Sequence, residues 1–320
     1  MGTYYRVQYH HEDLVSFSEE EIRKKIESDL LQVNREMSTY LKDSEISLLN
    51  KSKAGLSFQL SPWFSYVLKA SLEIAKKTEG AYDPTVGPLV NLWGFGPDVA
   101  VELPRKAMIK ETLEFVGFQK IHLQDSVVSK DHDKIYVDLS SIAKGFAVDR
   151  VFKTLEYLGF KNFLVDIGGE LKSSGKKEGS FWKVAIEEPF KSGSFYGFVY
   201  LDHKAIATSG NYRNIRETKN GYLSHTIDSK SGNPVKNQVI SVTVIHTECM
   251  RADAYATAIL VMGKEKGLAF ANKERIAAFI VIHDGYDFKF IKNVKKKNLF
   301  FSIPNPFEVK KNIFQHKNSN

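Results

Sequence analysis

The chain has 320 residues, of which 42% are hydrophobic and 12% aromatic, so it can bury a sizeable core in one large domain or in two lobes. This composition excludes a disordered protein, and no apolar run is long enough to span a membrane. The formal net charge of +7 resides at the C-terminal end, where residues 289–320 hold eight lysines and one acidic residue.

The single cysteine, Cys249, excludes an internal disulfide and a thiolate zinc site, and its apolar neighbours favour a buried small side chain over a nucleophile. We interpret residues 291–320 as a solvated basic tail. Contact with an anionic membrane or with nucleic acid is the alternative, but no nucleic-acid motif accompanies the charge. The first ten residues alternate like a strand and show no secretory leader, so the protein is cytosolic or its leader has been removed.

Two amphipathic helices are predicted in the first part of the chain. Apolar residues recur at helical spacing over residues 19–37. Ser61 and Pro62 form an N-cap and first-position pair for a second helix, which stops at Gly80. Between the two helices, residues 37–50 are predicted to form a polar loop.

Residues 80–97, GAYDPTVGPLVNLWGFGP, are rich in glycine and proline and therefore cannot form a long regular element. Their apolar side chains suit a pocket wall for a flat aromatic ligand, because glycine allows close approach of the backbone. An ordinary loop packed over the core explains the composition equally well.

A helix over residues 104–117 and short strands over residues 121–138 follow. Ser140 or Ser141 is expected to cap the next helix, which has Lys144 in its first turn, a place where an anion can bind. Further strands are predicted at residues 163–167, 181–187, 195–201, 205–212, 276–283 and 286–291, with hairpins joining the second to the third and the fifth to the sixth. These elements indicate an α+β fold with two lobes.

Residues 222–263 form the stretch around which the chain is organised. They contain His225, a strand over residues 239–245, and a helix with Asp253 in its first turn and Thr257 four residues later. The carboxylate and the hydroxyl share one helix face and offer two hard oxygen atoms, which suit Mg²⁺ acting on a phosphate ester. Taken alone, the helix also fits a carboxylate near a helix dipole and a hydroxyl bonded to the backbone.

Eight segments resemble, in order, those of the ApbE family, the FAD:protein FMN transferases. They are MGTYYRV (1–7), MSTYLKDSEISLLN (37–50), GAYDPTVGPLVNLWGFGP (80–97), VDLSSIAKGFAVD (137–149), FLVDIGGEL (163–171), IATSGNY (206–212), HTIDSKSGNPV (225–235) and ECMRADAYATAILVMG (248–263). The resemblance implies a T-fold-related α+β fold of mixed sheets with flanking helices. It also implies one two-lobed domain over residues 1–290, followed by a basic tail over residues 291–320.

The resemblance further implies an Mg²⁺-dependent transferase that splits the pyrophosphate of FAD. FMN would be attached through a phosphoester bond to a Thr or Ser of a target protein, with release of AMP. The acceptor would be a respiratory, ion-pumping or electron-transfer subunit. Family members are commonly exported lipoproteins, so we expect the cell envelope, with an inner-membrane lipid anchor facing the periplasm and the leader absent from this chain, or the cytoplasm if no leader exists.

Site residues are implied by the same motifs. The metal would be held by Asp253, Thr257 and the backbone of Ser141, and His225 would act as the general base toward the acceptor hydroxyl. FAD would be held near Met1, Tyr40, Ala81, Tyr82, Asp83, Asp138, Lys144 and Ile227. Asn211 replaces a carboxylate often found in relatives, which weakens any role proposed at that position.

Two other functions fit part of the sequence. In a metal-dependent FAD pyrophosphatase, water would attack in place of the hydroxyl. A non-catalytic flavin-binding protein would keep the pocket and lose the metal ligands, and the presence of Asp253, Thr257 and His225 argues against it.

Overall fold

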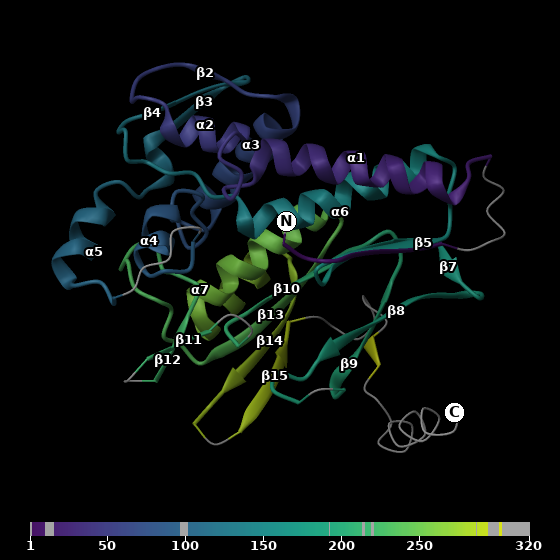
Figure 1. Ribbon diagram of the computed structural model, residues 1–320. Helices are drawn as coiled ribbons and strands as arrows, with labels where there is room; N and C mark the ends of the chain where they lie inside the picture. Colours follow the sequence, from purple (N-terminus) through teal and green to yellow (C-terminus); the bar gives the residue numbers. More distant parts are fainter. Residues whose placement is uncertain are drawn as a thin grey trace.

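The computed structural model describes residues 2–9, 16–96, 102–191, 193–212, 215–218, 221–285, 287–293 and 301–302. Met1 and most of the predicted basic tail lie outside these ranges. The described residues form one seven-stranded sheet and three smaller sheets, together with the helices of Figure 1. The predicted boundary at residue 290 stays a prediction.

The seven-stranded sheet has the order β1-β5-β6-β10-β13-β14-β15. Its strands are β1 (Tyr5–Tyr9), β5 (Phe163–Ile167), β6 (Glu170–Ser174), β10 (Ala205–Gly210), β13 (Val239–His246), β14 (Ala277–His283) and β15 (Phe288–Lys292). The α+β class is confirmed, but every strand pair in the described part of the chain is antiparallel, so the expectation of mixed strand directions is wrong. Hairpins such as β5–β6 and β14–β15 link neighbours directly, and a hairpin connection requires antiparallel strands.

Helices α6 (Ser140–Tyr157) and α7 (Cys249–Lys273) cover one face of this sheet, and α1 (Glu19–Met37) and α3 (Pro62–Lys77) pack on them (Figure 1). The other helices are α2 (Glu45–Lys51), α4 (Gly87–Leu92) and α5 (Lys106–Leu113), with a 3-10 turn at Phe118–Lys120. The core lies between α6 and α7 and the sheet, where alanines such as Ala147, Ala254 and Ala258 are fully buried. No helix within the described residues is long and apolar enough to cross a membrane.

Smaller sheets flank this body. They are β2 (Phe58–Gln59), β4 (Val127–Lys130) and β3 (Ile121–Gln124); β16 (Phe301–Ser302), β9 (Phe195–Leu201), β8 (Ser180–Glu187) and β7 (Lys176–Lys177); and β11 (Ile215–Thr218) with β12 (Gly221–Ser224). The β8–β9 hairpin packs on the sheet face opposite α6 and α7, around a second apolar cluster that includes Val184, Val199 and Ile206. The seven-stranded sheet is thus covered on both faces near its centre.

The predicted elements are confirmed in most places. Ser61 caps α3 by accepting the Phe64 N–H at 3.4 Å, and both predicted hairpins form. The prediction of a loop over residues 37–50 is wrong in its second half, because Ser44 caps α2 and this helix buries Ile46 and Leu49. Seven residues are too few for a convincing helical period in the sequence, whereas the tertiary core stabilises them in place.

Candidate active site

The α6–α7 contact brings the two predicted metal-side segments together. A side chain at Gly145 would place its Cβ 2.5 Å from the Cys249 carbonyl oxygen and 2.6 Å from the Met250 Cα, so only glycine allows this approach. The first turn of α7 therefore lies against α6. Asp253, which is 3% exposed, accepts the Gly145 backbone N–H at 3.1 Å through Oδ2.

Gly145→Ala is expected to destabilise the fold by about 1–3 kcal/mol, because the new methyl group meets backbone atoms that cannot yield as a side chain would. Alanine's better helix propensity offsets roughly 1 kcal/mol of this cost. Urea unfolding measures the effect. Gly2→Ala, whose methyl group would meet no atom within 4 Å, is the control, and equal stabilities of both variants would contradict the tight contact.

The start of α6 is irregular at Ser141, where φ is −94° and ψ is 15°. The Gly145 N–H, which faces the Ser141 carbonyl in a regular helix, donates to the Asp253 carboxylate. The predicted cap by Ser140 or Ser141 is wrong: the Asp138 carboxylate accepts the Ser140 N–H at 2.7 Å. A short carboxylate side chain can bond the backbone two residues ahead, and this local bond replaces a regular cap.

Lys144 lies between two buried carboxylates. Its Nζ is 2.9 Å from Glu170 Oε1 and 3.5 Å from Asp253 Oδ1. Burial by itself lowers the pKa of the Lys144 ammonium, but Asp253 and Glu170 outweigh burial and raise the pKa above its usual range. Lys144 is therefore a fixed positive charge beside Asp253, as an anion site requires.

Glu170 is a site residue that the sequence analysis missed. It is 3% exposed, and its Oε2 has no hydrogen-bond partner in the part of the chain that the structure describes. Burial raises the pKa of its carboxyl to about 7, against the lowering effect of Lys144. The signal in the sequence is the acidic residue that directly follows the Gly168-Gly169 pair at the end of a predicted strand.

In metal-free protein, Glu170→Gln is expected to stabilise the fold above neutral pH and to change its stability little in acid. The Glu170 carboxyl has an ordinary pKa of 4.5 and a pKa of about 7 in the folded protein. The wild-type protein therefore loses stability as the pH rises through the window between these two values, whereas glutamine does not titrate. The difference in unfolding free energy should grow by about 1–3 kcal/mol across the window. Urea unfolding with EDTA on both sides of the window measures it, and an equal effect at both pH values would contradict the titration.

Tyr82 lies beneath this cluster. It is 2% exposed, and its hydroxyl pairs with Ser71 Oγ at 3.0 Å and also with the Ser141 side chain. Burial raises the pKa of this hydroxyl above its usual range, and the Asp253 and Asp138 carboxylates add to the rise. Tyr82 thus packs against the Ser141 segment from the protein interior, and its ring is not exposed to solvent.

Asp83 organises the glycine-rich loop. Its carboxylate accepts the Thr85 N–H at 2.8 Å, the Thr85 hydroxyl at 2.6 Å and the Phe118 N–H at 3.0 Å. Burial raises the pKa of Asp83, and these donors oppose the rise. The side chain is thus engaged by the protein itself. A ligand near residues 81–83 would meet mainly the backbone.

Thr257 is joined to β10, because its Oγ1 lies 2.9 Å from Ser209 Oγ. Asn211 lies two residues after Ser209. Its Oδ1 accepts the Ser224 hydroxyl at 2.6 Å, and Ser224 Oγ accepts the Thr226 N–H at 3.1 Å. These bonds hold the backbone on both sides of His225. The His225 ring lies edge-on to Phe95, with 6.4 Å between the ring centroids.

The remaining predicted FAD residues are more scattered. Ile227, at 6% exposed, belongs to an apolar cluster with Leu89 and Trp93. Ala81, which precedes Tyr82 in the sequence, is half-buried. Tyr40 is 67% exposed in the turn between α1 and α2. Met1 lies outside the described residues. The structure therefore brings the two metal-side segments together through Gly145 and Asp253, and it distributes the FAD residues over several loops.

No group of three or more His, Cys, Asp or Glu side chains is placed to hold a metal ion within the described ranges. The predicted ligand set contains only one such side chain, Asp253, beside a hydroxyl and a backbone carbonyl. All three donors are oxygen atoms, and the carboxylate is buried, so the set fits a small hard cation such as Mg²⁺.

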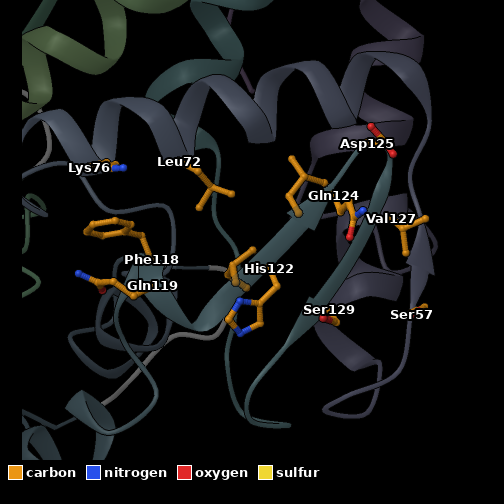
Figure 2. Close-up of a pocket in the computed structure, with 12 residues that line it drawn as sticks. Ser57, Leu72, Lys76, Phe118, Gln119, His122, Gln124, Asp125, Val127 and Ser129 are labelled. Atoms are coloured by element: carbon orange, nitrogen blue, oxygen red, sulfur yellow. The ribbon is translucent and has the colours of Figure 1, made fainter.

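Two cavities lie near these elements. One of about 950 Å³ runs between α3 and β3, with Leu72 and Lys76 above Phe118 and His122 (Figure 2). None of the predicted site residues that the structure describes lines it. The other, of about 420 Å³, lies between the seven-stranded sheet and β8–β9, and it reaches Glu170 and the end of β10. The second cavity therefore adjoins the candidate site.

Comparison with known proteins adds to this geometry. The sequence matches the profile of the ApbE family over residues 1–280, which include both α6 and α7. An FAD:protein FMN transferase of Haemophilus influenzae is 40% identical to the chain over 291 residues, covering 88% of this chain and 84% of that protein.

Solved structures are similar to the chain over nearly its full length. Flavin transferase ApbE from Vibrio cholerae superposes with a TM-score of 0.84 at 36% identity, covering 93% of this chain and 96% of that one. The apo form of flavinyl transferase ApbE from Pseudomonas stutzeri gives a TM-score of 0.83 at 36% identity, covering 90% of each chain.

Proposed function

The chain belongs to the ApbE family, and we propose that it is an FAD:protein FMN transferase. In this reaction the phosphoanhydride bond of FAD breaks and a phosphoester bond forms between FMN and a Thr or Ser hydroxyl of a target protein. AMP leaves, and the hydroxyl proton is lost as the new bond forms.

The observation that carries the proposal is the fixed charge arrangement at the α6–α7 contact. Phosphoryl transfer depends mainly on positioning and on neutralising charge. The ammonium of Lys144, held by Glu170 and Asp253, suits a pyrophosphate oxygen, and the N-terminal end of α6 adds a favourable dipole. Both the Lys144 ammonium and the end of α6 are held in position by the protein itself, before FAD binds.

We include Mg²⁺ in the proposal because the oxygen donors at this contact suit it. Asp253, Thr257 and the Ser141 carbonyl would hold the ion. When bound, it would neutralise pyrophosphate charge and make AMP a better leaving group. The irregular backbone at Ser141 and the bond from the Gly145 N–H to Asp253 support use of the carbonyl in this way.

His225 is proposed as the group that accepts the proton of the acceptor hydroxyl. A neutral imidazole near pH 7 can take a proton from a weakly acidic hydroxyl in the transition state. The Asn211–Ser224 bond and the edge contact with Phe95 fix the segment that carries the ring. Asn211 therefore serves this segment as a neutral amide, without the carboxylate common in relatives.

Incubation with FAD, Mg²⁺ and a candidate respiratory or electron-transfer subunit, followed by intact-mass measurement, tests the function. An adduct of one FMN with release of AMP is the expected result. AMP and free FMN without adduct would assign the protein as an FAD pyrophosphatase, and unchanged FAD would reduce it to a flavin-binding protein. Omitting Mg²⁺ is the matched control, and undiminished transfer without it would remove the metal from the proposal.

Location in the cell envelope, with an acceptor subunit in a respiratory or electron-transfer complex, belongs to the same proposal and rests on the family resemblance. An N-terminal lipid anchor on the native protein would place the enzyme at the inner membrane. Cell fractionation with mass measurement of the native N-terminus tests this, and a native, unlipidated protein found only in the cytoplasmic fraction would contradict it.

A further inference from the structure

Strand β10 is unequally paired on its two sides. All six of its residues pair with β13, from Ala205 opposite His246 to Gly210 opposite Ser241. On the other side only Ala205 and Ile206 pair with β6. The ladder stops there because β6 begins at Glu170, after the Gly168-Gly169 turn. Residues 207–210 of β10 therefore border a notch in the sheet.

The register shows which backbone groups point into this notch. The Ser173 N–H donates to the Lys204 carbonyl at 3.2 Å, and the Asn211 N–H donates to the Ile240 carbonyl at 2.8 Å. Since backbone groups alternate along an antiparallel strand, even-numbered residues of β10 face β6 and odd-numbered residues face β13. Among the described residues, the N–H and C=O groups of Thr208 and Gly210 have no strand partner on this side and form an edge directed at the notch.

The two faces of this edge differ in chemistry. The Ser209 hydroxyl bonds Thr257 on the face covered by α7, beside Asp253. The Thr208 hydroxyl lies 2.8 Å from that of Thr243 on the opposite face, and both line the cavity of about 420 Å³. A strand laid along the edge would therefore direct successive side chains alternately to the candidate reaction centre and to the cavity.

We propose that this edge binds an extended segment of the acceptor protein as an added β-strand. The inference rests on the proposed function, which requires a polypeptide hydroxyl to reach the α7 side of β10. The acceptor Thr or Ser would lie opposite Ser209, with its hydroxyl on the α7 face, and its two neighbours would pair with Thr208 and Gly210 through their backbones. Backbone pairing supplies affinity in such recognition, and side-chain pockets supply selectivity.

The cavity indicates which neighbours fit. Its walls carry both charges, from Arg6, Asp166 and Lys183, together with the hydroxyls of Thr208 and Thr243. Such a lining suits polar side chains of moderate size on either side of the acceptor residue, and it disfavours large apolar ones.

Short synthetic peptides with a central Thr and randomised flanks, incubated with the enzyme, FAD and Mg²⁺, provide the probe. In the best substrate, N-methylation of either residue flanking the central Thr should reduce FMN transfer at least tenfold, because those N–H groups face β10. N-methylation of the central Thr itself should change transfer less than threefold. Equal sensitivity at the three positions would overturn the inference, and so would a protein acceptor that is modified while no peptide is.

Amide hydrogen exchange on the wild-type protein gives a second readout. A peptide with Val in place of the central Thr should protect the amides of Thr208 and Gly210, while those of Ala207 and Ser209, already directed at β13, should stay unchanged and serve as internal controls. Protection of all four, or of none, would overturn the strand pairing. Release of AMP from FAD is measured in the same preparation. If FAD is cleaved but the strand does not pair, only this inference fails. If FAD remains intact, the proposed function fails.

Discussion

Asp253→Ala is expected to abolish turnover, lowering Mg²⁺-dependent AMP release from FAD by about 10³-fold or more. Loss of a metal ligand removes several kcal/mol of charge stabilisation from the transition state, and each 1.4 kcal/mol is about tenfold in rate. Asp253 is the single carboxylate in the proposed ligand set, and it also accepts the Gly145 N–H and faces Lys144. Steady-state AMP release over a range of Mg²⁺ concentrations measures the effect.

Asp253→Asn is the matched control for this variant. An amide keeps the size of the side chain and its acceptor for the Gly145 N–H, so the α6–α7 contact should survive, while the negative charge is lost. The Asn variant loses the ion pair with Lys144, so we expect it to be less stable than the wild type but more stable than the Ala variant, and still nearly inactive. An Ala variant with wild-type Mg²⁺-dependent AMP release would show that the site is misassigned.

His225→Ala is expected to lower FMN transfer by roughly 10²–10⁴-fold, the usual contribution of a general base, while FAD still binds. The ring contacts Phe95, and the neighbouring backbone is fixed by Ser224 and Thr226, so truncation should leave the loop in place. Single-turnover transfer measures the chemical step, and flavin fluorescence titration measures binding.

Asn211→Ala serves as the comparison for His225. It removes the acceptor of the Ser224 hydroxyl and should loosen the segment, giving a smaller loss of transfer than His225→Ala. If His225→Ala instead loses FAD binding and the bound fraction reacts at the normal rate, His225 contacts the substrate and does not act as a base.

The sequence alone determined the local features of this protein. A periodic apolar pattern predicted α1, and the Ser61–Pro62 pair predicted where α3 begins. The i,i+4 spacing of Asp253 and Thr257 placed both on one face of α7 before any packing was known. Ordered motifs over residues 1–263 indicated the family, because each motif reports local backbone and side-chain requirements.

The tertiary structure alone decided which distant groups meet. Glu170 reaches Lys144 across 26 positions of sequence, and Gly145 reaches Asp253 across 108, through a helix contact that depends on one missing side chain. The open edge of β10 likewise depends on where β6 begins, and α2 depends on a core to hold its short span. Such features follow from close packing and strand register between remote segments, and neither is encoded in the periodicity or composition of one segment.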